Sequence, residues 1–275
     1  MLIRLFNLAV LILLAQITSL RAAVPYNFDV DLGGKASRYT PILVRIAKNW
    51  PPFSRDEELP PAPSTPMSLR CFSTPGSPFF VGVRERMWVR ASLGAVDSVL
   101  SDINHYADLF PGYKEVRIVH ADGNRLLTRW EQIIPVFFLP NVIYDLNYVI
   151  DRSHSDKIIY RFQLSSGDHI RSSDGLIVVE PVTPSLTRYT EYDFWDADYG
   201  LLGTLAPGRI WRESVEDVVL SDLAIQLKAT YPEWSYEKVR NEADRQLQKD
   251  QVESAIRTRL PFPLLPDQTL TNTAK

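Results

Sequence analysis

The chain has 275 residues, of which 45% are hydrophobic and 23% are charged, so it can bury a core and is neither disordered nor fibrous. The formal net charge of −3 lacks the basic excess of nucleic-acid-binding proteins, and we expect no nucleic-acid partner. The single cysteine, Cys71, excludes an intrachain disulfide and a cysteine-based metal site.

Residues 1–23 have the layout of a secretory signal peptide. Met1–Arg4 is short and basic, Leu5–Ile17 is mostly apolar, and small residues around Ala22 offer a cleavage site. The apolar run is shorter than the ~20 residues needed to span a bilayer. We therefore expect export to the periplasm or secretion, with retention of this segment as an anchor as the alternative.

Residues 24–78 are expected to form a proline-rich arm outside the main domain. Eight prolines fall between Pro51 and Pro78, and proline removes backbone donors and favours extended chain. Cys71 lies in this arm without a neighbouring base, so we expect an unreactive surface cysteine.

Within the arm, the apolar residues Ile42, Leu43, Ile46 and Trp50 recur at the spacing of one face of a helix. The simpler interpretation is a short helix that packs on the main domain. The alternative is a helix that contacts a membrane surface.

From residue 79 to residue 232 the pattern predicts a folded domain. Phe79–Ala91 alternates as a strand does, and apolar positions from Val96 to Ala107 predict a helix that ends at Phe110-Pro111-Gly112. Further strands are predicted at Tyr113–Ala121, Arg125–Phe137, Val142–Ile150, Lys157–Leu164, Leu176–Val182 and Leu186–Trp195. Their short connections indicate an antiparallel meander.

The alternation also predicts which face of the sheet is covered. Asp145 and Asn147 oppose the aromatic and apolar positions of their strand, and Arg161 and Gln163 do so in the next strand. One face is therefore expected to be wet and the other covered. The predicted cover is a helix that follows Pro207, with an apolar stripe at Trp211, Val215, Val218, Val219, Leu223 and Leu227.

Residues 233–275 are expected to add a charged helix and a loose tail. The helix, Tyr236–Arg257, has few apolar anchors and is predicted to be solvated. These anchors are Val239, Ala243, Leu247, Val252 and Ile256.

Two segments resemble a known family. Asp102–Gly112, which ends in Asp-Leu-Phe-Pro-Gly and precedes Tyr-Lys-Glu-Val, resembles the polyketide cyclase/dehydrase and coenzyme-Q-binding branch of the START-like superfamily. Gly175–Pro181 and Thr187–Tyr192 are similar to its last two strands. The resemblance implies an α+β helix-grip fold, in which a curved antiparallel sheet wraps around a long C-terminal helix. It also implies an apolar cavity for lipids, quinones, polyketides or other hydrophobic molecules.

Eleven side chains are predicted to face this cavity as ligand-binding residues. They are Thr128, Trp130, Tyr144, Leu146, Tyr148, Tyr160, Phe162, Val215, Val219, Asp222 and Leu223. Such residues either form a core whose polar groups bond internally or orient an apolar ligand. For an enzyme, Asp222 and a tyrosine are the acid–base candidates that the pattern offers.

Motifs for other chemistry are not found in the sequence. The histidines lack metal-ligand spacing, and there is no nucleophile elbow, phosphate loop or dinucleotide fingerprint, so neither a metal nor a cofactor is predicted. Asp193, Asp196 and Asp198 are expected to form a solvated turn after the last strand.

The sequence therefore favours an exported carrier that binds a hydrophobic ligand or lipid in a cavity between sheet and helix. The first alternative is a cyclase- or hydratase-type enzyme that uses the same cavity. The second is a non-catalytic interaction module whose interior is filled by its own side chains. The oligomeric state is not specified by the sequence.

Overall fold

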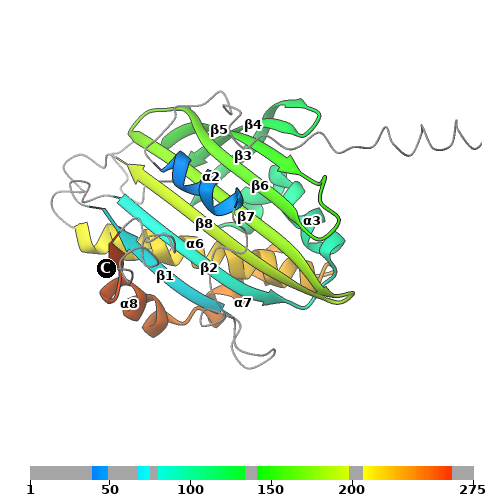
Figure 1. The fold of residues 1–275 in the computed structure, drawn as a ribbon. Coiled ribbons are helices and arrows are strands. Elements are labelled where there is room, and N and C mark those ends of the chain that lie inside the picture. The colour runs from blue at the N-terminus through cyan, green and yellow to red at the C-terminus, as the bar shows by residue number, and fades with distance from the viewer. Residues whose placement is uncertain (1–38, 49–66, 75–79, 134–140, 198–206, 262–275) are drawn as a thin grey trace, which may run out of the picture.

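The computed structural model describes residues 39–48, 67–74, 80–133, 141–197 and 207–261, which form one largely antiparallel sheet with helices on both faces (Figure 1). The predicted signal peptide and most of the proline-rich arm lie outside the described residues. No described helix combines the length and the apolar character that crossing a membrane requires.

The sheet has the described strands in the order β3-β4-β5-β6-β7-β8-β2-β1-β9. Their bounds are β1 Met67–Ser73, β2 Phe80–Val89, β3 Tyr113–Asp122, β4 Arg125–Gln132, β5 Val142–Asp151, β6 Ile158–Gly167, β7 Ile170–Thr183, β8 Leu186–Ala197 and β9 Leu260–Pro261. The strands from β3 to β8 follow the chain as the predicted meander, and β2 pairs antiparallel with β8. β7 starts at Ile170 rather than at Leu176, because Ser172–Asp174 continue the pairing with β8.

The helices lie on both faces of this sheet. Their bounds are α2 Thr40–Lys48, α3 Leu93–Ser101, the 3₁₀ turn η2 Ile103–His105, α4 Tyr106–Leu109, α6 Pro207–Thr230, α7 Tyr236–Gln246 and α8 Lys249–Arg257. α3 begins where the Ser92 hydroxyl accepts a hydrogen bond from the Ala95 amide at 3.2 Å. Figure 1 shows α6 behind the sheet and α2 in front of it. The predicted α+β helix-grip fold is confirmed by this strand order and by the long helix that the sheet encloses.

The main core lies between the sheet and α6, as the alternation predicts. It joins the inward side chains of the sheet to one side of α3 and of α6, where Val96, Leu100, Val215 and Val219 are at most 3% exposed. Burial of this apolar area is the main favourable term in the stability of the fold.

The opposite face of the sheet is not uniformly wet, which corrects the expectation for two of its residues. Arg161 and Gln163 were expected to face solvent, but they are 4% and 2% exposed. For Gln163 the reason is α2, whose Thr40 hydroxyl accepts from Gln163 Nε2 at 2.8 Å and donates to Asp174 Oδ1 at 2.7 Å. Toward β4 and β5 this face is more open, and Arg129 and Asp145 pair there.

α2 packs its apolar side on the sheet. Leu43 and Ile46 are buried, and with Tyr39 they join a second cluster that contains Phe80 and Phe194. The Tyr39 and Phe80 rings stack at 4.6 Å between centroids. This packing agrees with the simpler interpretation of the segment, and contact with a membrane surface stays a prediction.

Met67–Ser73 lie within the predicted arm, yet they form β1, which pairs along its length with β2. Cys71 is therefore 1% exposed, and the expectation of a surface cysteine is wrong. Burial, reinforced by the charge of Glu85, raises the pKa of the Cys71 thiol to about 12.

The charged C-terminal segment is two helices rather than one solvated helix. α7 ends at Gln246 and α8 begins at Lys249. Val239, Ala243 and Val252 are at most 2% exposed, because α7 packs on α6 and α8 packs on α6 and β1. Few apolar anchors are thus enough to dock both helices on the domain.

Candidate functional site

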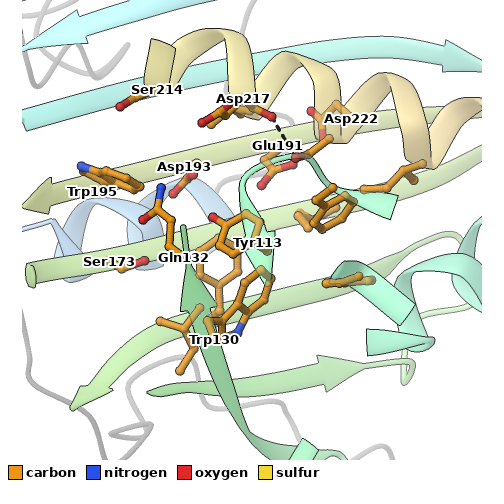
Figure 2. Close-up of a pocket in the computed structure, with 18 of the residues that line it drawn as sticks. Tyr113, Trp130, Gln132, Ser173, Glu191, Asp193, Trp195, Ser214, Asp217 and Asp222 are labelled. Carbon is orange, nitrogen blue, oxygen red and sulfur yellow. Dashed lines mark hydrogen bonds between the residues drawn. The ribbon is translucent and has the colours of Figure 1, made fainter. Parts of the chain in front are cut away.

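A cavity of about 90 Å³ lies between the inner face of the sheet and α6 (Figure 2). β8 and α6 supply acidic side chains, while α3, α4 and strands β3 to β6 supply most of the apolar and aromatic ones. The lining residues are Leu100, Tyr106, Phe110, Tyr113, Trp130, Gln132, Tyr144, Leu146, Tyr148, Phe162, Ser173, Ile177, Glu191, Asp193, Trp195, Ser214, Asp217, Val218, Ser221, Asp222 and Ile225.

The aromatic wall of the cavity includes Tyr113, Trp130, Tyr144 and Phe162. The polar atoms of the first three are engaged in hydrogen bonds. Trp130 Nε1 donates to Thr128 Oγ1 at 2.9 Å, and Tyr144 OH donates to Tyr113 OH at 3.3 Å. The Trp130 and Tyr144 rings are nearly parallel, with an interplanar angle of 11°. Because these donors are already engaged, the wall presents mainly ring faces and edges to the cavity.

Two glycines make room for rings of this wall. Gly175 lies opposite Phe162 in the pairing of β6 with β7, and a Cβ at Gly175 would lie 1.8 Å from Phe162 Cζ. Gly167 lies opposite Tyr144, and its Cβ would lie 2.7 Å from Tyr144 Cβ. Any larger residue at either position would displace an aromatic side chain of the cavity.

The acidic wall is formed by Glu191 and Asp193 of β8 and by Asp217 and Asp222 of α6. Figure 2 shows the α6 carboxyl groups above those of the strand. Glu191 and Asp193 are two positions apart, so the pleat puts both side chains on the inner face. Two chain segments far apart in sequence thereby bring four acids to one side of the cavity.

Burial raises the pKa of every acid in this wall. For Asp217 the pKa rises to about 7, with added effect from the charges of Glu213 and Glu216. The pKa values of Glu191 and Asp222 rise well above the ordinary range, because burial is reinforced by a neighbouring acid. The pKa of Asp193 also rises well above the ordinary range, because its burial is reinforced by the charge of Glu191. These groups hold protons that exposed carboxyls lose.

The Tyr189 hydroxyl lies within hydrogen-bond distance of two carboxyl groups, and this requires a proton on one of them. Tyr189 OH is 2.5 Å from Glu191 Oε2 and 2.9 Å from Asp222 Oδ1. A phenol has one proton and donates it to only one of these oxygens. The other carboxyl must then be protonated to hydrogen-bond with the phenol oxygen, so a neutral acid is part of this arrangement.

Asp193 Oδ1, on a residue that lines the cavity, has no hydrogen-bond partner in the described part of the chain. Asp222 is hydrogen-bonded to Glu85 and Glu191, which requires a shared proton between carboxyl groups. Glu85 of β2 is fully buried, and burial together with the charges of Glu191 and Asp193 raises its pKa to about 8. Unpartnered buried polar atoms are uncommon in native proteins because they cost free energy.

Six of the predicted ligand-binding residues line the cavity together. They are Trp130, Tyr144, Leu146, Tyr148, Phe162 and Asp222. The alternation along β4, β5 and β6 placed the first five on the inner face. Whether they contact a ligand stays a prediction.

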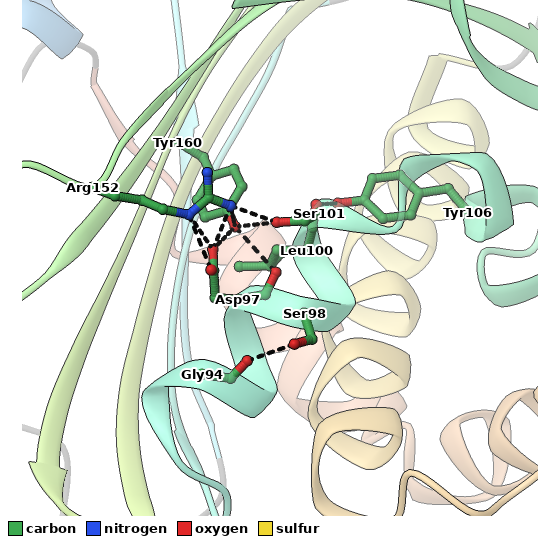
Figure 3. A network of polar contacts seen from close by, with 8 residues as sticks. All are labelled: Gly94, Asp97, Ser98, Leu100, Ser101, Tyr106, Arg152 and Tyr160. Atoms are coloured by element: carbon green, nitrogen blue, oxygen red, sulfur yellow. Dashed lines mark hydrogen bonds and ion pairs between the residues drawn. The ribbon is translucent and has the colours of Figure 1, made fainter. Parts of the chain in front are cut away.

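The other predicted residues lie nearby but serve the surrounding structure. Thr128 bonds Leu146 O and Trp130 Nε1, and Val215, Val219 and Leu223 are packed in the main core. Tyr160 is held at α3, where its hydroxyl bonds Asp97 Oδ1 and lies 3.1 Å from Ser101 Oγ (Figure 3).

Arg152 completes this contact between α3 and the sheet. Its guanidinium reaches both carboxyl oxygens of Asp97 and donates to Ser101 Oγ at 2.6 Å (Figure 3). Burial and the hydrogen bond from Tyr160 to Asp97 raise the pKa of the phenol above its usual range. The Tyr160 hydroxyl is thus committed to positioning α3, which forms one end of the cavity.

The sequence analysis missed Glu191, Asp193 and Asp217. Asp193 was expected in a solvated turn, but it lies within β8, paired with Val83 of β2 and Gly175 of β7, and it lines the cavity. Asp196 is also within β8 and is 7% exposed, while Asp198 lies outside the described residues. The available signal was the alternation of Tyr189 with the two acids, which puts all three on one face.

No protein-family model matches the chain, and no curated protein matches it. Several solved structures are similar. Human STARD10 has a TM-score of 0.49 and 14% identity, over 73% of this chain and 82% of that one. The human StarD13 (DLC2) lipid transfer and protein localization domain has a TM-score of 0.48 and 12% identity, over 72% and 98%. The Zhui aromatase/cyclase from Streptomyces sp. R1128 has a TM-score of 0.42 and 21% identity, over 62% and 96%.

Each of these structures is less than 25% identical to this chain and has a TM-score under 0.5. The fold of this chain is assigned from its own strand order and from α6. At such identities nothing about a ligand or a reaction is carried over to its cavity.

Proposed function

We propose that this protein binds a small hydrophobic molecule in the cavity between the sheet and α6. The observation that carries the proposal is the cavity itself, which has an aromatic wall on one side and four carboxyl groups on the other. A concave, mostly apolar site with a few convergent polar groups is the usual form of a small-molecule site. The lipid-transfer and aromatase/cyclase descriptions of the similar structures support the same class of ligand.

The size of the cavity limits the ligand. Pockets that enclose drug-sized ligands usually have volumes of about 300–1,000 Å³, whereas this cavity has about 90 Å³. A diacyl lipid does not fit inside such a space. The proposal is therefore a small ring compound, or the end of a longer molecule.

Binding is tested with the full chain, purified without detergent. Native mass spectrometry is expected to show a co-purified molecule, and saturation-transfer NMR is expected to detect bound n-propylbenzene. Ligand-free mass spectra together with no saturation transfer would overturn the proposal and favour the interaction module with a filled interior.

Export is part of the proposal. It is supported by the basic start, the apolar run and the small residues of segment 1–23. Expression of the full chain with N-terminal sequencing of the secreted or periplasmic fraction tests it. A mature protein that starts near Val24 is expected, and full-length protein confined to the cytoplasm would contradict export.

One arrangement favours a cyclase- or hydratase-type enzyme as the second candidate. Asp217 lines the cavity and has a pKa raised to about 7 by burial, which suits general acid–base catalysis. Returning the co-purified molecule to fresh protein separates the two functions. A carrier releases it with unchanged mass, whereas such an enzyme converts it with gain or loss of water.

A further inference from the structure

A second cavity, of about 320 Å³, adjoins the cavity between the sheet and α6, which is called the first cavity from here on. It is lined by α3, η2, α4, the C-terminal end of α6 and the start of α7. Tyr106 is the single described residue that lines both cavities. On α6, Ile225 lines the first cavity and Ala229, one helical turn further along, lines the second. The two cavities therefore follow one another along α6, with Tyr106 in the wall between them.

A hydrogen bond holds Tyr106 in this wall. Its hydroxyl donates to Leu100 O at 2.6 Å (Figure 3), and its ring packs beside Phe110 with 4.5 Å between the centroids. Side chains change between staggered rotamers without rearrangement of the backbone. A turn of the Tyr106 side chain breaks this bond and takes the ring out of the wall.

The second cavity supplies the space that the first one lacks. Pockets that enclose drug-sized ligands usually have volumes of about 300–1,000 Å³. The second cavity, at about 320 Å³, lies within this range, whereas the first, at about 90 Å³, does not. A molecule that is longer than one ring and starts in the first cavity therefore finds its remaining space in the second.

The polar side chains of the second cavity have unused hydrogen-bond donors. Both carboxyl oxygens of Asp102 are engaged, because Oδ1 accepts from His105 Nδ1 at 2.7 Å and Oδ2 accepts from Tyr236 OH at 3.4 Å. The hydrogen bond to Asp102 raises the pKa of His105 and so favours its cation. Lys228 Nζ donates two of its three protons to backbone carbonyls of the loop between α6 and α7, at 2.8 Å each. Apart from the Tyr236 ring, whose centroid lies 4.8 Å from Nζ, the described part of the chain offers no acceptor to His105 Nε2 or to the third proton of Lys228.

These two donors differ from everything that lines the first cavity. An anionic group accepts from both of them and pairs with their positive charges. None of the described lining residues of the first cavity is Lys, Arg or His, so that cavity offers no cation to such a group. Rings therefore lie at one end of the joined space and cationic donors at the other.

We propose that the ligand is an elongated molecule whose ring lies in the first cavity and whose anionic end is bound by His105 and Lys228 in the second, with Tyr106 turned aside between them. This inference rests on the proposed function and adds the shape and charge of the ligand. The second cavity becomes part of the binding site.

The test uses phenyl-substituted acids of three chain lengths, each paired with the alcohol of the same length. The acids are 3-phenylpropionic, 6-phenylhexanoic and 8-phenyloctanoic acid, titrated into the full chain and followed by calorimetry. A longer acid is expected to bind at least about tenfold more tightly than its alcohol, and 3-phenylpropionic acid is expected to show no such preference. A preference that is absent at every length, or that is already present at the shortest, overturns the inference and leaves the proposed function standing. If neither these probes nor n-propylbenzene binds, the proposed function fails as well.

Two variants test whether one molecule occupies both cavities. Leu146→Trp fills the first cavity, and Ser98→Trp fills the second from an exposed position of α3. Each is expected to weaken binding of the longer acid at least about tenfold, but only Leu146→Trp is expected to abolish n-propylbenzene binding. The matched control is Asp244→Trp at an exposed position of α7, which is expected to change neither. Acid affinity that survives either filling variant at wild-type strength overturns the inference. Should a filling variant fail to fold, displacement of n-propylbenzene by the acid decides the same question.

A charge variant tests the anionic end. Lys228→Met is expected to remove the preference for the acid over its alcohol and to leave n-propylbenzene binding unchanged. The control is Lys238→Met at an exposed position of α7, which is expected to retain the preference. His105→Gln removes the other cation and decides if Lys228→Met fails to fold. An acid preference that is as strong in the variant as in the wild type overturns the inference.

Discussion

Cys71 illustrates how a single side chain depends on its strand. It sits on β1 with its thiol toward the main core, where Val83 is its partner in the register with β2. The prolines on both sides of β1 gave no sign of this, because they flank the strand without interrupting it. The thiol is protected both by its burial and by its raised pKa.

We expect Cys71→Ser to lower the free energy of unfolding by about 1–3 kcal/mol, because a hydroxyl would be buried among apolar groups. Urea unfolding followed by circular dichroism measures the change. Cys71→Ala adds no polar group and is the control, with a smaller expected loss. A serine variant as stable as the wild type would contradict the position of this residue in the core.

The residues of the cavity differ in how well their positions could be predicted from the sequence. Trp130 and Leu146 were placed correctly because alternation within one strand is a local property. Glu191 and Asp193 were missed as cavity residues because their burial depends on α6, which follows later in the chain and crosses over β8. Polar residues on a strand are ordinarily assigned to the wet face, and only the tertiary cover reverses that assignment.

At the scale of elements, β5 offers a direct test of the cavity. Leu146 lines it and is 3% exposed, and Asn147 lies on the opposite face of the same strand. We expect Leu146→Trp to remain folded with a melting temperature near that of the wild type, because the indole extends into the cavity. It is expected to abolish the saturation transfer from n-propylbenzene.

The matched control for this change is Asn147→Trp, which puts the same ring on the other face and is expected to retain binding. In a filled interior, the added volume at Leu146 would typically cost about 1–3 kcal/mol. A Leu146→Trp variant that melts far below the wild type, with no binding by the wild type, would therefore show that the interior has no usable cavity.

α2 is the second element with a measurable role. The sequence predicted a helix there but assigned it to a peripheral arm, since nothing local shows that it covers β6 and β7. We expect Leu43→Ala to cost about 2–5 kcal/mol, as for other buried leucines. Pro41→Ala, at an exposed position of the same helix, is the control with little effect. Equal stability of the two variants would mean that α2 does not contribute to the fold.

At the scale of the whole molecule, the buried acids link stability to pH. The pKa of Glu85 is raised from 4.5 to about 8 and that of Asp217 from 3.8 to about 7. At a pH between the ordinary and the raised pKa of each group, the folded state holds a proton that the unfolded state has lost. Raising the pH through this range therefore favours unfolding. Glu242, which pairs with Arg245 and whose pKa is lowered to about 2, acts in the opposite direction at lower pH.

We therefore expect the melting temperature to be highest near pH 5 and to fall as the pH rises to 8. Thermal unfolding followed by circular dichroism at constant ionic strength measures this dependence. Glu85→Gln removes one of the titrating groups and is expected to flatten the curve. A melting temperature that rises from pH 5 to pH 8 would show that these acids are ionised in the folded protein.

The strand order also constrains when the sheet can be completed during synthesis. β3 to β8 assemble from neighbours in the chain, but Phe80 of β2 pairs with Asp196 of β8, and Phe72 of β1 pairs with Leu260 of β9. β1 and β2 leave the ribosome first and find their last partner only when almost the whole domain has been made. Contacts of such long sequence separation form slowly. For a chain that is exported, as proposed, this delay keeps the nascent protein in the extended state that a translocation channel accepts.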